Sequence, residues 1–356
     1  MNPLERLRAV LQSDRYPALL VTHMPSIRWL TGFTGSSAVA LVTTEHAVFI
    51  TDSRYTLQAR EEVRDFAVRS FSSPMRMDEV LHTVFDEFGV RRLAFDRNHV
   101  TVGRYQSWQE KWQGVELEPV DDPCESLRMI KAPEEIAKIR EACRLADDCM
   151  RHVVDRLHVG KTERAILFEI HQFLWSHGAE ASFAPIVVAG ERSARPHGTA
   201  SDRPLQPGDF LTLDLGARLD GLCSDITRTV GIRKLSDRQR EIYHRVLEVQ
   251  QGAIERLQPG ANGRDVDAWV RETLGRHGLA EYFGHGLGHG LGLEVHDPGR
   301  LSPTVDQPIT VGQVWTVEPG VYIEPLGGVR IEDDVLVTES GPEVLTHFPR
   351  DLLLVD

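Results

Sequence analysis

Cysteine is scarce in this chain, which also has neither a long hydrophobic run nor a positive net charge. Its four cysteines show no C-x-x-C spacing: Cys124, Cys143, Cys149 and Cys223. No apolar run approaches the length of a membrane span, and nothing at the N-terminus resembles a signal peptide. We therefore expect free thiols and a cytoplasmic location.

The formal net charge of −13 argues against nucleic acid or an anionic membrane as a partner. The first third of the chain contains no nucleotide-binding loop. With 356 residues, 41% of them hydrophobic and 26% charged, the chain is long enough for two domains and has the composition of a soluble globular enzyme.

Residues 1–126 have the pattern of an α/β domain with a mixed sheet. Apolar runs predict strands and amphipathic segments predict helices: strands at 18–21, 38–42, 47–51 and 93–95, and helices at 1–11, 53–63 and 77–88. A polar stretch then precedes a long helix that begins near Pro133. Its apolar stripe includes Cys143 and Met150, which we assign to the core. The second domain is placed at 127–356.

The second domain contains a divergent duplication. Gly160 and Gly260 stand 100 residues apart, and Asp214 and Glu318 differ by 104. Ordered matches of this kind predict two helices followed by an acid-bearing strand hairpin, twice over. The result would be a pseudo-twofold α+β domain with a site between its halves.

The segment 282–297 carries three histidines among five glycines: His285, His289 and His296, with Gly284, Gly286, Gly288, Gly290 and Gly292. Glycine permits close approach of the backbone, and imidazoles can bind metal, relay protons or form hydrogen bonds. This pattern indicates a functional site but leaves its chemistry open.

Four acids interrupt strand-like apolar runs: Asp214, Asp225, Glu318 and Glu332. An acid in a strand interior is disfavoured unless its charge is used, so we expect one cluster. The first two lie on strands joined through Asp220-Gly221. A four-residue loop would pair Asp214 directly with Asp225, whereas a two-residue turn would make them diagonal neighbours on one face. Both registers bring them together.

Adjacent carboxylates repel each other unless a proton or a cation lies between them. Four carboxylates would neutralise two divalent ions. With a single histidine, this oxygen-rich set favours Mn²⁺ or Co²⁺ over Zn²⁺, which is still possible.

These segments resemble the five-ligand site of the pita-bread metallopeptidases, especially the proline peptidases: Xaa-Pro dipeptidase, or prolidase, and Xaa-Pro aminopeptidase. The resemblance covers the last two-thirds of the chain strongly and the first third weakly. It implies a creatinase N-terminal-like domain, a pita-bread catalytic domain, a homodimer, and a metal-bridged hydroxide that cleaves the bond to a proline at the second position of a small peptide. By residue match, the ligands of the two metal ions would be Asp214, Asp225, His289, Glu318 and Glu332.

The resemblance also gives Glu318 a proton-shuttle role. Four further residues match substrate-binding and proton-transfer positions: His197, His285, His296 and Arg330. We expect His296 and His197 to stabilise the oxyanion or orient the carbonyl. The other nearby acids would be solvated or would support the ligands from behind: Glu294, Asp297, Asp333 and Asp334. Trp315 and Tyr322 are assigned to the core.

Three other functions are disfavoured. A creatine amidinohydrolase or a metal-free peptide-binding module would lack the full ligand set. A methionine aminopeptidase would lack the preceding α/β domain and the pattern of His285, His296 and Arg330. Dipeptidase and aminopeptidase share all these motifs, but a dipeptidase needs a cation for the substrate carboxylate. In the catalytic domain that charge could come from Arg192, Arg195, Arg300 or Arg330. Our candidate is Arg54 of the first domain, held by Asp52, which would make the protein a prolidase.

Overall fold

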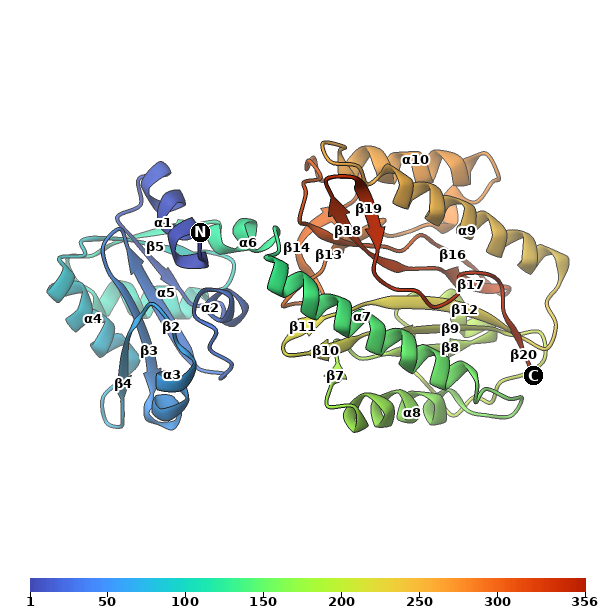
Figure 1. Cartoon of the computed structure of the whole chain (residues 1–356), viewed down its shortest axis with the longest axis horizontal. Coiled ribbons are helices and arrows are strands. Elements are labelled where there is room, and N and C mark those ends of the chain that lie inside the picture. The colour runs from blue at the N-terminus through green and yellow to red at the C-terminus, as the bar shows by residue number, and fades with distance from the viewer. The chain divides into compact units, whose positions relative to one another are not determined.

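The computed structural model describes all 356 residues, which divide into two compact units, Met1–Arg128 and Met129–Asp356 (Figure 1). No helix in either unit is long and apolar enough to cross a membrane.

A six-stranded mixed sheet forms the centre of the first unit, in the order β4-β3-β2-β1-β5-β6. Its strands are β1 (Ala18–Val21), β2 (Ala38–Thr43), β3 (Ala47–Asp52), β4 (Ala67–Phe71), β5 (Arg92–Asp96) and β6 (Glu116–Val120). Strand β1 is antiparallel to β2 and parallel to β5. The α/β domain with a mixed sheet is therefore confirmed.

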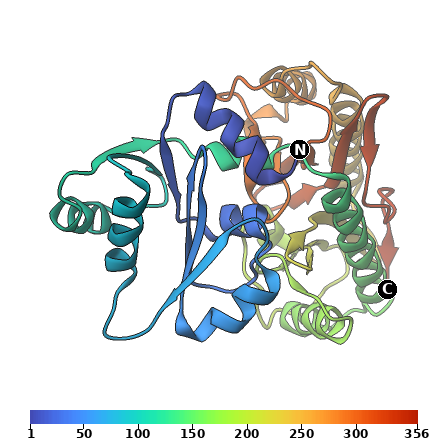
Figure 2. The ribbon, with the colours of Figure 1, turned by 60° about the vertical axis from the view of Figure 1, so that its left-hand side comes forward.

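Helices pack on both faces of this sheet (Figure 2). They are α1 (Pro3–Ser13), α2 (Met24–Thr31), α3 (Thr56–Glu62), α4 (Met77–Phe88), α5 (Val102–Lys111) and α6 (Pro123–Arg128), with a 3-10 turn η1 (Ser53–Tyr55). Trp108 and Phe85 are buried against the strands. The predicted helices and strands are present, but the sequence analysis missed helices α2, α5 and α6 and strands β4 and β6. Both missed strands are edge strands that bury few side chains, so their sequences lack an apolar run.

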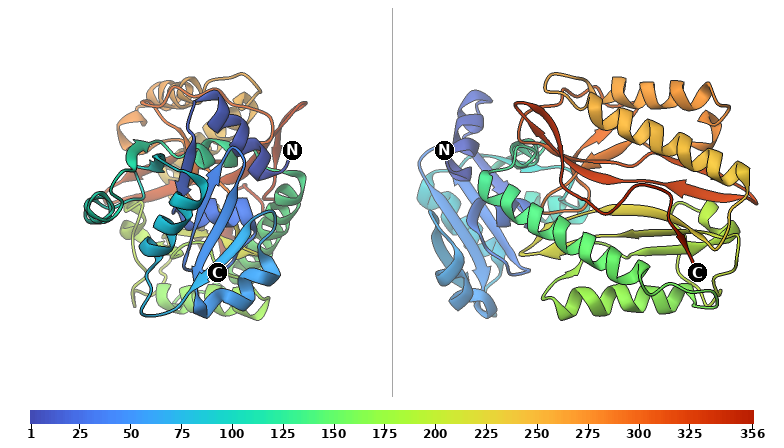
Figure 3. Two further views of the ribbon diagram at one scale, coloured as in Figure 1. Left: turned by 90° about the vertical axis from the view of Figure 1, so that its left-hand side faces the viewer. Right: turned by 45° about the vertical axis from the view of Figure 1, so that its right-hand side comes forward.

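The second unit has two helix pairs, one on each side of its strands (Figure 3). The helices are α7 (Pro133–Val154), α8 (Glu163–Ser176), α9 (Asp237–Arg256) and α10 (Gly263–Gly275), with 3-10 turns η2 (Gly190–Ala194) and η3 (Ala280–Tyr282). The first pair packs with one core cluster and the second pair with another.

The first half of this unit contributes β7 (Glu180–Ala181), β8 (Ile186–Ala189), β9 (Phe210–Leu215), β10 (Ala217–Leu219), β11 (Leu222–Cys223) and β12 (Ile226–Ile232). The second half contributes β13 (Gly288–Gly290), β14 (Asp297–Leu301), β15 (Val314–Val317), β16 (Gly320–Ile323), β17 (Gly327–Arg330), β18 (Asp333–Thr338), β19 (Gly341–Val344) and β20 (Leu354–Val355). The larger sheets run β20-β12-β9-β8 and β14-β13-β15-β18-β19.

Equivalent hydrogen bonds confirm the duplication. The Gly160 N–H donates to the Leu205 carbonyl at 3.0 Å, and the Gly260 N–H donates to the Ile309 carbonyl at 2.8 Å. Both glycines have a positive φ, +91° and +85°, which a side chain would strain. The same turn therefore precedes α8 and α10.

The hairpin of the first half decides the register. Leu219 pairs with Leu222 across a two-residue turn, in which Asp220 and Gly221 both have positive φ. This is the conformation of a tight hairpin turn. Asp214 consequently pairs with Thr227. The direct pairing of Asp214 with Asp225 is wrong, and the diagonal arrangement is correct.

Candidate metal centre

The four acids predicted from the sequence lie within or next to strands of the second unit. Only Asp214 lies inside a strand, β9. Asp225 precedes β12, Glu318 follows β15, and Glu332 stands between β17 and β18. The expectation that all four acids lie inside strands was thus wrong for three of them, because the hydrogen-bonded strand pairing is interrupted at their positions. The Asp225 N–H, for example, donates to the Asp334 carboxylate at 2.8 Å.

The glycines around His289 allow β13 to pack closely between its neighbours. A Cβ atom on Gly288 would lie 2.0 Å from the Thr316 carbonyl oxygen, and one on Gly290 would lie 2.1 Å from that of Pro298. These glycines therefore let the backbone of β13 lie close to the backbones of β14 and β15.

The His289 ring has a defined tautomer. Its Nδ1 lies 3.0 Å from the Gly290 carbonyl oxygen, which can only accept, so Nδ1 carries the proton. The lone pair is then on Nε2, which lies 3.5 Å from Glu318 Oε1 and 3.8 Å from Asp225 Oδ2. Burial lowers the pKa of His289 to about 3, so the ring is neutral, as a metal ligand must be.

The acids converge on His289. Asp225, His289 and Glu332 each offer a ligand atom within 4.8 Å of the others. The Oδ1 atoms of Asp214 and Asp225 are buried and have no hydrogen-bond partner. Because an unpaired buried carboxylate oxygen is costly, these atoms fit a bound cation. Four carboxylates and one neutral imidazole form a donor set suited to divalent ions.

Repulsion among the acids changes their pKa values. Burial, followed by the charges of Glu332 and Asp214, raises the pKa of Asp225 well above its usual value. Burial also raises the pKa of Glu318 to about 8. Bound cations would favour the ionised carboxylates and remove this repulsion.

Arg330 orients one acid from each half of the duplicated unit. Its Nη2 donates to Asp214 Oδ2 at 2.5 Å, and its Nε donates to Thr227 Oγ1 at 3.1 Å. The Thr227 hydroxyl in turn donates to Glu332 Oε2 at 2.6 Å. Arg330 therefore acts on Asp214 directly and on Glu332 through Thr227.

Tyr322 joins Arg330 to His285. Its Oη accepts from Arg330 Nη1 at 2.8 Å and lies 3.0 Å from His285 Nε2. His285 Nδ1 must donate to the Gly286 carbonyl oxygen, 2.8 Å away, so Nε2 accepts the Tyr322 proton. The assignment of Tyr322 to the core was incomplete. Alternation along a strand could not have linked Tyr322 to Glu318, because Tyr322 lies on β16 and Glu318 follows β15.

The His296 and His197 side chains are both exposed. The His296 ring meets the His289 ring edge to face, with centroids 4.5 Å apart. Burial lowers the pKa of His285 to about 4.

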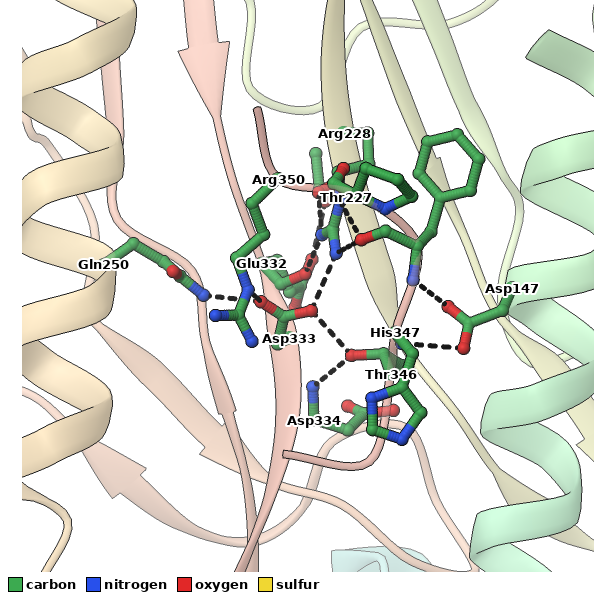
Figure 4. Close-up of polar contacts among 12 residues, drawn as sticks. Asp147, Thr227, Arg228, Gln250, Glu332, Asp333, Asp334, Thr346, His347 and Arg350 are labelled. Atoms are coloured by element: carbon green, nitrogen blue, oxygen red, sulfur yellow. Dashed lines mark hydrogen bonds and ion pairs between the residues drawn. The ribbon is translucent and has the colours of Figure 1, made fainter. Parts of the chain in front are cut away.

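Asp333 lies in a buried network behind Glu332 (Figure 4). Four donors from distant segments meet its carboxylate: Arg228, Gln250, Thr346 and Arg350. Arg228 Nη1 also donates to the Glu332 carbonyl at 2.6 Å. This network fixes the backbone at the break between β17 and β18.

Asp334 supports Asp225 from behind. Its Oδ2 accepts the Asp225 N–H at 2.8 Å and the Cys143 thiol at 3.3 Å, so Cys143 does more than fill the core. Asp297 is buried and paired with Lys131 at 2.5 Å. Solvation is therefore wrong for Asp297, Asp333 and Asp334, and Asp334 has the contact expected of a residue that supports Asp225.

Replacing Asp334 by alanine should weaken metal binding by about 10- to 100-fold, the usual effect of removing a partner behind a ligand. The Asp225 backbone would lose its acceptor, and calorimetric titration with Mn²⁺ measures the result. Asp334→Asn keeps an oxygen acceptor, and Cys143→Ala removes only the thiol, so both should bind more tightly than Asp334→Ala. Wild-type affinity in Asp334→Ala would rule out the supporting role.

Arg54 lies in the first unit, with 72% of its side chain exposed. Asp52 caps η1 and accepts from Arg54 Nε at 2.7 Å and from Nη2 at 2.9 Å. Asp52 therefore holds Arg54, as expected, and the outer edge of the guanidinium faces solvent.

Each half of the duplicated α+β unit contributes two acids to a site around a neutral imidazole. This arrangement defines the protein as a metal-dependent hydrolase. The chain belongs to metallopeptidase family M24, whose model matches residues 137–339. Residues 3–130 match the creatinase/prolidase N-terminal domain.

Relatives match nearly the whole chain. An Xaa-Pro dipeptidase of Pyrococcus horikoshii is 33% identical over 98% of both chains. The structure of an Xaa-Pro dipeptidase from Bacillus anthracis has a TM-score of 0.95 at 38% identity and covers 99% of both chains. That of an X-Pro aminopeptidase from Thermotoga maritima has a TM-score of 0.91 at 35% identity and covers all of both. The pita-bread fold expected from the resemblance is confirmed.

Proposed function

We propose that this protein hydrolyses the Xaa-Pro bond of dipeptides, with proline at the second position. The convergence of Asp214, Asp225, Glu318 and Glu332 on the neutral His289 ring supports this proposal most directly. Xaa-Pro aminopeptidase activity on longer peptides is the second candidate, favoured by the similarity to the Thermotoga maritima enzyme.

Two divalent ions held by the four acids and His289 would supply an activated water and polarise the scissile carbonyl. Glu318 moves the proton from this water toward the leaving nitrogen. The leaving proline nitrogen must be protonated because it carries no hydrogen in the peptide. His296 and His197 donate hydrogen bonds to the developing oxyanion. Arg330, Tyr322 and His285 form a hydrogen-bonded chain that holds their side chains in position for substrate binding.

We further propose Mn²⁺ as the natural metal, because the donor set is rich in oxygen. The catalytic domain would be residues 127–356, and the assembly a homodimer, which light scattering at micromolar concentration tests. A monomer there would contradict it. The cytoplasmic location stays a prediction from the free, buried cysteines.

Metal analysis combined with turnover of Ala-Pro and Ala-Pro-Ala tests the activity. A dipeptidase would contain about two ions per chain and cleave Ala-Pro preferentially. Preference for Ala-Pro-Ala would identify the aminopeptidase, and turnover of neither would reject both.

Arg54→Ala should lower kcat/KM for Ala-Pro by about 10- to 150-fold, since a hydrogen bond to a charged group is worth roughly 1.5–3 kcal/mol. We propose that the exposed edge of this guanidinium binds the substrate carboxylate. Cleavage of Ala-Pro-Ala should change much less. Equal losses on both substrates, with a lower Tm, would instead make Arg54 a structural partner of Asp52. Arg69→Ala, which removes another partly exposed ion-paired arginine of the first unit, is the control.

A further inference from the structure

Glu163 is a buried acid of the second unit that the proposed reaction does not use. It is the first residue of helix α8, and its side chain is 0% exposed. Thr162 already caps this helix, because its hydroxyl accepts the Ala165 N–H at 3.2 Å. The Glu163 carboxylate is therefore not needed as the cap, and a buried carboxylate requires other donors.

The donors to Glu163 lie at both ends of one segment, residues 190–200, which we call the His197 segment. Just before it, the Ala189 N–H donates to Oε1 at 2.8 Å. Just after it, the N–H and the hydroxyl of Ser201 donate to Oε2 at 2.8 Å and 2.6 Å. One carboxylate thus joins the two ends of the segment.

Arg192 extends this contact into the His197 segment. Its Nε lies 3.2 Å and 3.3 Å from the two carboxylate oxygens of Glu163. Its Nη2 donates to the Thr199 carbonyl at 2.5 Å. Hydrogen bonds between charged groups are stronger than neutral ones, so this guanidinium is held firmly. Backbone on both sides of His197 is therefore tied to the start of α8.

The His197 segment also contacts the candidate metal centre. The carbonyl of Pro196, next to His197 in the chain, accepts from Arg330 Nη1 at 3.4 Å. The same guanidinium donates to Asp214 through Nη2. His197 therefore lies in a segment that is anchored by Glu163 and reaches the residue that orients Asp214.

The duplication separates the carboxylate from the needs of the fold. The Glu163 N–H donates to the Arg203 carbonyl at 3.2 Å. The counterpart of Glu163 in the second half is Gly263, whose N–H donates to the Gln307 carbonyl at 3.1 Å. The same turn thus forms before α10 without an acid, and the acid is present only in the half that carries His197.

We propose that Glu163 is a positioning residue for the peptidase reaction, which closes the His197 segment and so keeps the His197 imidazole in place for the substrate. The inference rests on the proposed function, in which His197 donates a hydrogen bond to the developing oxyanion. A misplacement of about 1 Å can lower a rate by about 100-fold, so this anchor acts on kcat without touching the substrate.

A double-mutant cycle of Glu163→Gln and His197→Ala tests this role. The amide keeps the size of the side chain but has one acceptor oxygen in place of two, so it can hold only one end of the segment. We expect Glu163→Gln to lower kcat for Ala-Pro by about 10- to 100-fold at unchanged metal content. In the His197→Ala background the same substitution should have no further effect, because the imidazole that it positions is absent.

Hydrogen exchange measured by mass spectrometry reports on the anchor without any turnover. The amides of residues 190–200 should exchange faster in Glu163→Gln than in the wild type. The control is Glu169→Gln, because Glu169 is another ion-paired acid of α8 but pairs with Lys161 at 2.7 Å. This variant should match the wild type in both exchange and kcat.

Losses that multiply in the double variant, or unchanged exchange of residues 190–200, would overturn the positioning role. If Glu163→Gln has a lower Tm, Ser201→Ala supplies the same cycle, because it removes one donor and keeps the carboxylate. Its smaller loss of kcat should again vanish in the His197→Ala background, and a multiplied loss would overturn the role. Faster exchange in Glu163→Gln, together with no cleavage of Xaa-Pro substrates by the wild type, would reject the proposed function and leave the anchor in place.

Discussion

Asp225→Asn and Glu332→Gln should each lose bound metal and Ala-Pro turnover together, by at least about 100-fold, since even partners behind a metal ligand cost 10- to 100-fold. Both acids lie beside His289, and both have raised pKa values, caused first by burial and then by neighbouring acids. The neutral amides cannot offset the charge of two divalent ions. Elemental analysis and steady-state kinetics on the same samples measure the two losses.

The matched control is Glu241→Gln, which neutralises a half-exposed acid on α9. It should leave metal content and kcat unchanged. Normal metal content and turnover in either site variant would remove the proposed dinuclear centre. If a site variant lost turnover but kept both ions, the substituted residue would act in catalysis and not in metal binding.

His296→Ala should retain metal but lower kcat by about 100- to 1,000-fold, the typical effect of removing an oxyanion donor. Its ring packs edge to face on His289, whereas the Nε2 of His289 faces the acids. The substitution thus removes a group proposed to act in the transition state. Metal content, kcat and KM should be measured on one preparation.

His244→Ala is the control, because His244 lies on the exposed face of α9. It should behave as the wild type in all three measurements. Loss of metal in His296→Ala, with retention in His289→Ala, would mean that the roles of these two histidines have been exchanged.

The sequence predicted those features that depend on local patterns. Buried strands such as β2 read as apolar runs, and α4 was predicted with its observed bounds because its apolar positions follow the helical period. The duplication was also visible, since positive-φ glycines and acids recur at fixed separations. The four acids stood out because charged groups rarely interrupt apolar runs without a use, and His289 stood out because it lies in a glycine-rich segment.

Tertiary structure decided the register and the surroundings of these residues. Two turns between Asp214 and Asp225 were compatible with the sequence, and only the folded hairpin selected the diagonal pairing.

The buried state of Asp333 was likewise invisible locally, because its donors Arg228 and Gln250 lie 105 and 83 residues away in the chain. A buried charge is stable only when such distant partners meet it. Sequence patterns therefore indicated the five ligand candidates, while long-range pairing determined which residues lie behind them and how Tyr322 came to join Arg330 to His285.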